Sequence, residues 1–150
     1  MRTAARPIGY RRGVSSELRD RHASLVGTIG FDRALAGIEL LEVGDGRARA
    51  RLPVTPAVQN LGGALHGGAI CTLVDDVGSI AIMSADRDMR PGVSTDLNVS
   101  FLAPGKGGGA VIALATALKV GRTLAFVTVD VRREDDGVLV AQGRMTKHLG

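Results

Sequence analysis

Apolar residues recur along the chain with two different periods, which predict helices and strands. Residues 67–85 carry apolar side chains at the 3.6-residue repeat of a helix. They form one stripe: Ile70, Leu73, Val74, Val77, Ile80 and Ala81. In residues 93–101, Val93, Thr95, Leu97, Val99 and Phe101 alternate with polar residues, and residues 47–52 alternate arginine with apolar residues. An alternation of this kind predicts strands with one face buried.

Weaker patterns complete the predicted order of elements. Ser15 or Ser16 can cap a first helix. Turn-forming residues at 44–46 and 134–137 predict hairpins, and residues 55–65 predict a loop. The remaining expected strands are residues 37–43, 110–120, 123–133 and 138–147. The expected order is therefore a helix, two strands, a central apolar helix and four further strands.

The central helix is apolar at so many positions that a sheet has to cover it. Antiparallel strands joined by short turns would curl around this helix and give an α+β fold. An open antiparallel sheet has edges, which natural proteins cover or pair. We therefore expect two copies of the chain to pair through a sheet edge. Residues 1–36 form the expected basic tail and first helix, and residues 37–150 form the main domain.

Composition narrows the classes of function. The 150-residue chain has no Trp, one Tyr and three Phe, too few aromatic residues for stacking nucleic-acid bases. Cys71 is the single cysteine, which excludes an internal disulfide and a cysteine-based metal cluster. The net charge of +4 comes without a dense basic run, which favours a phosphorylated small ligand over nucleic acid. No apolar stretch is expected to span a membrane.

The start of the central helix carries the candidate chemistry. His66, Gly67 and Gly68 open the helix, and Asp75 follows eight residues after Gly67. A helix N-terminus presents unpaired N–H groups that can hold a developing oxyanion, and a glycine lets a carbonyl approach closely. A carboxylate nearby can activate water. The pattern predicts hydrolysis of a carbonyl compound.

Each of these residues also has a structural interpretation. The glycines can form a tight entry turn, His66 can act as a base or support the loop, and Asn60 can be a turn former. On a helical wheel Asp75 lies beside small and apolar residues (Cys71, Gly78 and Ile82), which predicts room for a substrate. Asp76 lies on the other flank, beside Thr72 and Met83, and is expected to be solvated.

Five segments together resemble the hotdog-fold thioesterases, in the phenylacetate-pathway-like branch. They are residues 60–68 (NLGGALHGG), 72–75 (TLVD), 91–96 (PGVSTD), 119–126 (KVGRTLAF) and 141–150 (AQGRMTKHLG). The resemblance covers residues 37–150. It implies an antiparallel sheet wrapped around the central helix, and homodimers that assemble into homotetramers. It also implies an acyl-CoA substrate and active sites at the dimer interface.

The resemblance also implies roles for individual residues. The Gly67 N–H would polarise the thioester carbonyl, and Asp75 of the neighbouring subunit would act as general base or nucleophile. Asn60 would orient water or substrate, His66 would support the loop, and Ser94 would assist near the water. Coenzyme A would pass Lys106, Lys119, Arg122, Thr123 and His148. Coenzyme A is part of the substrate, so no cofactor and no metal are expected. The Gly107–Gly109 run departs from the family loop.

Two other functions remain open from the sequence. One is a hotdog hydratase acting on acyl thioesters, whose pattern places Phe-Pro after the histidine where this chain has Gly67 and Gly68. The other is a non-catalytic acyl-CoA binding protein, which would not need Asp75. The acyl group itself is not specified. We expect a cytoplasmic protein, with a mitochondrial location as the alternative because residues 1–14 are Arg-rich and lack acids.

Overall fold

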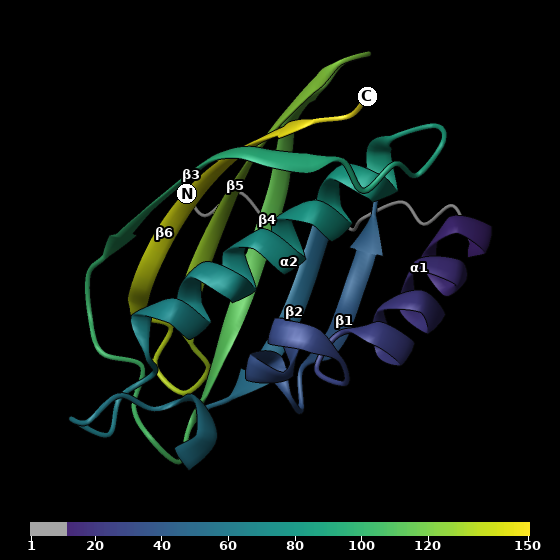
Figure 1. Ribbon diagram of the computed structural model, residues 1–150. Helices are drawn as coiled ribbons and strands as arrows, with labels where there is room; N and C mark the ends of the chain where they lie inside the picture. The colour runs from purple at the N-terminus through teal and green to yellow at the C-terminus, as the bar shows by residue number, and fades with distance from the viewer. Residues whose placement is uncertain (1–11) are drawn as a thin grey trace, which may run out of the picture.

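The computed structural model describes residues 12–150, and in them a long helix crosses one face of a six-stranded antiparallel sheet (Figure 1). The helices are α1 (Arg12–Leu25) and α2 (Gly67–Ala85), with short 3₁₀ segments at Gly30–Leu35 and Pro56–Val58. The strands are β1 (Glu39–Gly44), β2 (Arg47–Pro53), β3 (Val93–Phe101), β4 (Ala110–Val120), β5 (Leu124–Arg133) and β6 (Leu139–His148). This arrangement is the hotdog architecture expected from the sequence.

The strand order is β1-β2-β4-β5-β6-β3, so β3 leaves its sequence neighbours and pairs with β6 at the far edge. The α2 helix packs on β2, β4 and β5, and α1 packs beside β1 at the opposite edge from β3 (Figure 1). Two hydrogen bonds from the Arg19 guanidinium to the carbonyls of Leu40 and Leu41 fix α1 to β1. Among residues 12–150, no strand pairs with the outer edge of β3.

The predicted hydrophobic stripe of α2 forms the core. All six of its residues are buried, and they contact inward-facing residues of the sheet such as Val127 and Met145. Two glycines let the helix and sheet approach closely. A Cβ on Gly78 would lie 2.9 Å from the Met145 side chain, and one on Gly143 would lie 2.5 Å from Val74. The stiff Val74 side chain cannot move away from a Cβ on Gly143, so that position requires glycine. At Gly78 the flexible end of Met145 would have to shift.

The bounds of α2, β3 and β4 are those predicted from the sequence, and the other strands differ by one or two residues. The expected start of the first helix was wrong. Residues Ser15 and Ser16 lie inside α1, which already includes Arg12, so neither caps its start. Serine favours cap positions but is tolerated inside a helix at modest cost.

One expectation about membranes also needs correction. By length and composition α2 is apolar enough to cross a membrane, contrary to the prediction that no stretch would be. In the structure it is the core helix, with more than half of its apolar window buried against the sheet and α1. Its hydrophobicity is explained by this burial inside the fold.

The β3 strand is exposed along most of its length. Its apolar residues Val93, Leu97 and Phe101 are 69%, 39% and 55% exposed, although they alternate as in a half-buried strand. A long apolar edge strand presents free backbone groups and is a template for pairing with another chain. The structure therefore contains an edge of the kind that the expected dimer requires.

Candidate active site

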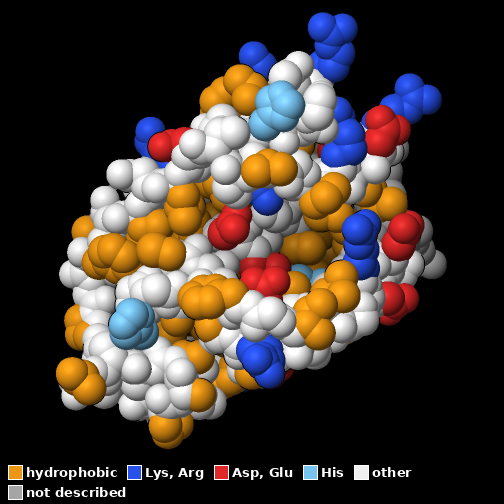
Figure 2. Space-filling model, viewed as in Figure 1, with side chains coloured by type: hydrophobic (Ala, Val, Ile, Leu, Met, Phe, Trp, Pro, Cys, Tyr) orange, Lys and Arg blue, Asp and Glu red, His pale blue; other side chains and the backbone are white. Residues whose placement is uncertain are grey.

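Asp75 projects from the middle of α2 toward β3. Its carboxylate is 47% exposed, and the Ser94 hydroxyl of β3 donates a 2.7 Å hydrogen bond to Oδ1. The face of the molecule that carries α2 has acidic side chains near its middle, with hydrophobic ones around them (Figure 2). The structure thus brings Asp75 and Ser94 together, with the carboxylate open to a ligand.

A buried lysine lies behind this carboxylate. Lys147 of β6 is 8% exposed, and its Nζ lies 3.8 Å from Asp75 Oδ1. The same ammonium donates a hydrogen bond to the Ser79 hydroxyl, which in turn donates to the main-chain carbonyl of Asp75. Burial lowers the pKa of Lys147, whereas the charges of Asp75 and Asp76 oppose this shift. Asp75 therefore has a cation beside it that sequence reasoning did not place there.

His66 caps the N-terminus of α2. Its ring Nδ1 accepts a 2.9 Å hydrogen bond from the Gly68 N–H, and its main-chain N–H donates to the Val58 carbonyl. Because Nδ1 is an acceptor here, the neutral ring carries its proton on Nε2. The ring therefore supports the helix start, which is the loop-supporting alternative among the expected roles of His66.

The N–H of Gly67 points out of this helix start. It makes no hydrogen bond to any group in residues 12–150, as is usual for the first N–H groups of a helix. The Phe101 ring lies beside it, since a Cβ built on Gly67 would be 3.4 Å from Phe101 Cε1. The partial positive charge of the helix terminus adds to the attraction for an anion. Gly67 thus has the geometry of an oxyanion donor.

Asn60 shapes the loop before α2. Its Oδ1 accepts hydrogen bonds from the N–H groups of Gly62 (2.9 Å) and Ala64 (3.1 Å), as in a tight turn. The side chain is exposed and lines an open depression together with Gln59, Leu61, Gly62 and His66. The turn-forming role is therefore present, and the NH₂ group of the amide remains available to donate.

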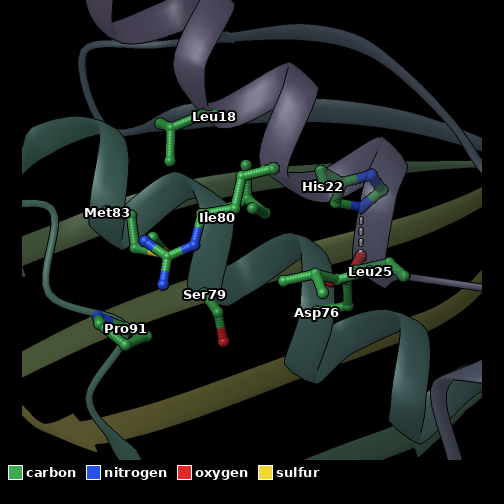
Figure 3. Close-up of a pocket in the computed structure, with 10 residues that line it drawn as sticks. Leu18, His22, Leu25, Asp76, Ser79, Ile80, Met83 and Pro91 are labelled. Carbon is green, nitrogen blue, oxygen red and sulfur yellow. Dashed lines mark hydrogen bonds and ion pairs between the residues drawn. The ribbon is translucent and has the colours of Figure 1, made fainter. Parts of the chain in front are cut away.

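Asp76 does not have the solvated position that the wheel predicted. Its carboxylate is 12% exposed and lies 2.8 Å from Nε2 of His22, a buried residue of α1. Figure 3 shows this pair where α1 and α2 meet. The pair lines a cavity of about 180 Å³ together with Leu18, Arg21, Leu25, Val26, Ser79, Ile80, Met83 and Pro91. The wheel failed because α1, which covers this flank, comes from a distant part of the sequence.

Replacing Asp76 with alanine is expected to lower stability and leave catalysis intact. The change removes the hydrogen-bond partner of buried His22, and an unsatisfied buried polar group costs about 1–3 kcal/mol. Urea unfolding measures this loss, and steady-state hydrolysis at a temperature where the variant is folded measures kcat. A normal unfolding midpoint would contradict a structural role for the pair.

The flank beside Asp75 is closely packed at two of the three positions that the wheel placed there, Gly78 and Ile82. The space next to Gly78 is filled by Met145 and Val127, and Ile82 is fully buried. Small residues on this flank bring α2 close to the sheet instead of forming a pocket. Any space for a substrate has to lie on the outer side of Asp75.

Gly67 and Asp75 are too far apart to act on one carbonyl within one chain. Eight residues of α-helix separate them, which corresponds to a rise of about 12 Å. An oxyanion donor lies about 3 Å from the oxygen it stabilises, and a base contacts the attacking water. One chain therefore cannot bring its own Gly67 N–H and its own Asp75 carboxylate to the same carbonyl group.

The candidate coenzyme A residues are also divided between two separate regions, at opposite ends of β4. All of them are exposed, but Lys119, Arg122, Thr123 and His148 lie at the β4–β5 turn. Lys106 pairs with Ala64 near the start of α2, at the other end of β4. The eleven residues of β4 make this separation roughly 30 Å. Lys106 also lies 3.7 Å from both Asp135 and Asp136, which partly neutralise it.

Comparison with known proteins identifies the family. The model of the thioesterase superfamily matches residues 62–140, more than half of the chain, including Gly67, Asp75 and Ser94. The chain belongs to the thioesterase superfamily. Human acyl-coenzyme A thioesterase 13 is 37% identical to it over 137 residues, which cover 91% of this chain and 97% of the human protein. The resemblance noted from the sequence is confirmed.

Solved structures agree with this family assignment. Zebrafish thioesterase superfamily member 2 matches with a TM-score of 0.85 at 41% identity, covering 90% of this chain and 97% of that one. The mouse protein matches with a TM-score of 0.81 at 38% identity, covering 90% and 96%. A Streptococcus pneumoniae hypothetical thioesterase, solved with coenzyme A, shares the fold with a TM-score of 0.73 at 23% identity, covering 79% and 89%.

Sequence reasoning missed Lys147 and Ser79 at the thioesterase site. A signal for Lys147 was present in the alternation of β6. Ala141, Gly143 and Met145 face the core, and the period of two places Lys147 on the same face. The alternation along β6 therefore already indicated that Lys147 faces inward. A buried lysine almost always has a partner, so a polar or acidic group was to be expected near it.

Proposed function

We propose that the chain hydrolyses acyl-CoA thioesters to a free acid and coenzyme A, with paired chains forming the active site. The observation that carries this proposal is the exposed Asp75 carboxylate, held by Ser94, on the helix whose first N–H is free at Gly67. The name of the human relative supports acyl-CoA as substrate, and the net charge of +4 suits its phosphates.

The proposed reaction needs only water and the side chains described. Asp75 removes a proton from water as the oxygen attacks the thioester carbon, and the Gly67 N–H stabilises the oxyanion that forms. Collapse of this intermediate breaks the C–S bond, and the thiolate leaves and takes up a proton. Direct attack by Asp75 is the alternative. In that case the thiolate leaves as Asp75 forms an anhydride with the acyl group, and water then opens the anhydride. Mass spectrometry after one turnover in ¹⁸O-water tests for it, because label in the Asp75 carboxylate shows that water opened the anhydride at the aspartyl carbon.

The β3 edge explains how two chains would complete each site. Ser94 and the neighbouring Asp75 lie near the start of β3, whereas Phe101 and the neighbouring Gly67 lie at its end. Two β3 strands paired antiparallel about a two-fold axis run in opposite directions, so the start of one strand meets the end of the other. Asp75 of one chain then approaches Gly67 of its partner.

The same reversal brings the coenzyme A candidates together. Lys106 lies at the Gly67 end of its chain, and Arg122, Thr123 and His148 lie at the other end. In the antiparallel pair these ends become neighbours, so both groups can line one path for the phosphates. A second apolar patch on the outer face of the sheet includes Leu114, Leu118 and Phe126, all exposed. It is our candidate for the contact between dimers in a tetramer.

Mixed dimers test whether each site uses two chains. Chains with Asp75→Ala and chains with Gly67→Pro are produced together with different affinity tags, and the mixed species is purified on both tags. We expect about half of wild-type activity, because one of its two sites receives an intact residue from each chain. Sites built within one chain would leave both centres defective and the mixed dimer inactive.

A thiol-release assay over a panel of acyl-CoA substrates tests the activity itself. We expect free coenzyme A to appear with at least one acyl group, and to fall sharply in the Asp75→Asn variant. Tight binding of acyl-CoA without thiol release would favour a carrier instead. Hydration of an enoyl-CoA without release of coenzyme A would favour a hydratase.

A further inference from the structure

Lys147 is buried where an apolar residue would be expected from the fold. It occupies an inward position of β6, and its ammonium reaches the polar side of α2 at Ser79 and Asp75. Burying an ammonium carries a desolvation cost, and a well-packed apolar residue of similar volume often does at least as well for stability. The lowered pKa of Lys147 reflects this burial. Stability alone does not account for a charge at this position.

The contacts of the ammonium converge on one residue. Its nearest carboxylate oxygen is Asp75 Oδ1 at 3.8 Å, and its hydrogen-bond acceptor Ser79 is bonded to the main chain of Asp75. Asp76 adds a weaker attraction but is already paired with His22. The neighbouring β3 strand contributes the neutral hydroxyl of Ser94. Within residues 12–150, these are the groups that face the ammonium and the Asp75 carboxylate.

We propose that Lys147 is a positioning residue for Asp75, an inference that rests on the function proposed above. Ser94 holds Oδ1, and the ammonium attracts the same oxygen from behind, so Oδ2 is turned outward to the water. Lys147 itself touches neither water nor thioester in this arrangement.

The Lys147→Met variant tests this role, since methionine keeps most of the length of the unbranched side chain and removes the charge. We expect kcat to fall about tenfold to a hundredfold, as misplacing a catalytic group does, with KM little changed. Lys147→Arg, which keeps a positive charge at this position, should restore much of the lost kcat.

The matched control is Arg144→Met, on the exposed face of the same strand, which should leave kcat and KM unchanged. A double-mutant cycle adds a readout that a folding defect does not produce. If Lys147 acts through Asp75, Lys147→Met costs nothing further in an Asp75→Asn background. Circular dichroism melting checks that each variant is folded at the assay temperature.

The outcomes separate this inference from the proposed function. A normal kcat in Lys147→Met, with Asp75→Asn inactive, would overturn the role of Lys147 alone. Equal losses from Lys147→Met in the wild-type and Asp75→Asn backgrounds would also overturn it. Wild-type turnover by Asp75→Asn would overturn the proposed mechanism first.

Discussion

Replacing Gly67 with proline is expected to lower kcat for thioester hydrolysis by about 100- to 1,000-fold. Proline has no N–H, so the substitution removes the proposed oxyanion donor and changes little else. This loss corresponds to about 2.7–4 kcal/mol of transition-state stabilisation. Single-turnover measurements with a saturating acyl-CoA give the chemical rate directly.

The fold should accept this proline. Gly67 is the first residue of α2, where proline is well tolerated because the N–H has no partner within the helix. The preceding residue, His66, has φ −66° and ψ 139°, the extended conformation that a following proline requires. The His66 cap to the Gly68 N–H does not involve Gly67. A thermal melt close to that of wild type would verify these points.

Gly67→Ala is the matched control. It keeps the N–H and adds a Cβ at ordinary contact distance from Phe101. We expect it to retain most of the activity that the proline variant loses. If alanine and proline cause equal losses, the effect is steric, and the oxyanion role of the Gly67 N–H is wrong.

Asp75→Asn is expected to remove about 100- to 10,000-fold of kcat, the usual contribution of a general base. Asparagine keeps the size of the side chain and an oxygen that can accept the hydrogen bond from Ser94, but it is a poor proton acceptor. Asp75→Ala should be equally inactive, and it would leave the Lys147 ammonium without its nearest carboxylate. The thiol-release assay and size-exclusion chromatography together show whether the inactive protein is still assembled.

Asp76→Asn is the matched control for this change, one residue along the same helix. It preserves a hydrogen-bonding side chain toward His22 and should keep turnover within a few-fold of wild type. Near-normal hydrolysis of every acyl-CoA by Asp75→Asn would refute the role of Asp75. Loss of activity in Asp76→Asn, with Asp75→Asn still active, would show that Asp76 is the essential acid and that its assignment to Asp75 is wrong.

Much of the fold was predictable from periodicity because its strongest patterns are local. The stripe on α2 and the alternation in β3 each specify their element within a few turns or residues, and both have the predicted bounds. The candidate residues at the helix start were predictable for the same reason. The cap at His66 and the unpaired N–H and missing side chain of Gly67 are properties of adjacent positions in the sequence.

The rest of the site depends on contacts between distant segments. Lys147 reaches Asp75 across 72 positions of sequence, and His22 reaches Asp76 across 54. A helical wheel shows which residues share a flank but not which strand or helix covers it. The surroundings of Asp75 and Asp76 depend on how α1, β3 and β6 pack against α2. The wheel could not predict that packing.

The close packing at Gly78 and Gly143 has a consequence for how substrate preference can change. At these two glycines the contact between α2 and its own sheet is too close to admit an acyl group. The walls that select it must be residues outside that core, whose replacement does not disturb the buried contacts. Preference for one acyl group over another can then diverge between related proteins while the stability of the scaffold is preserved.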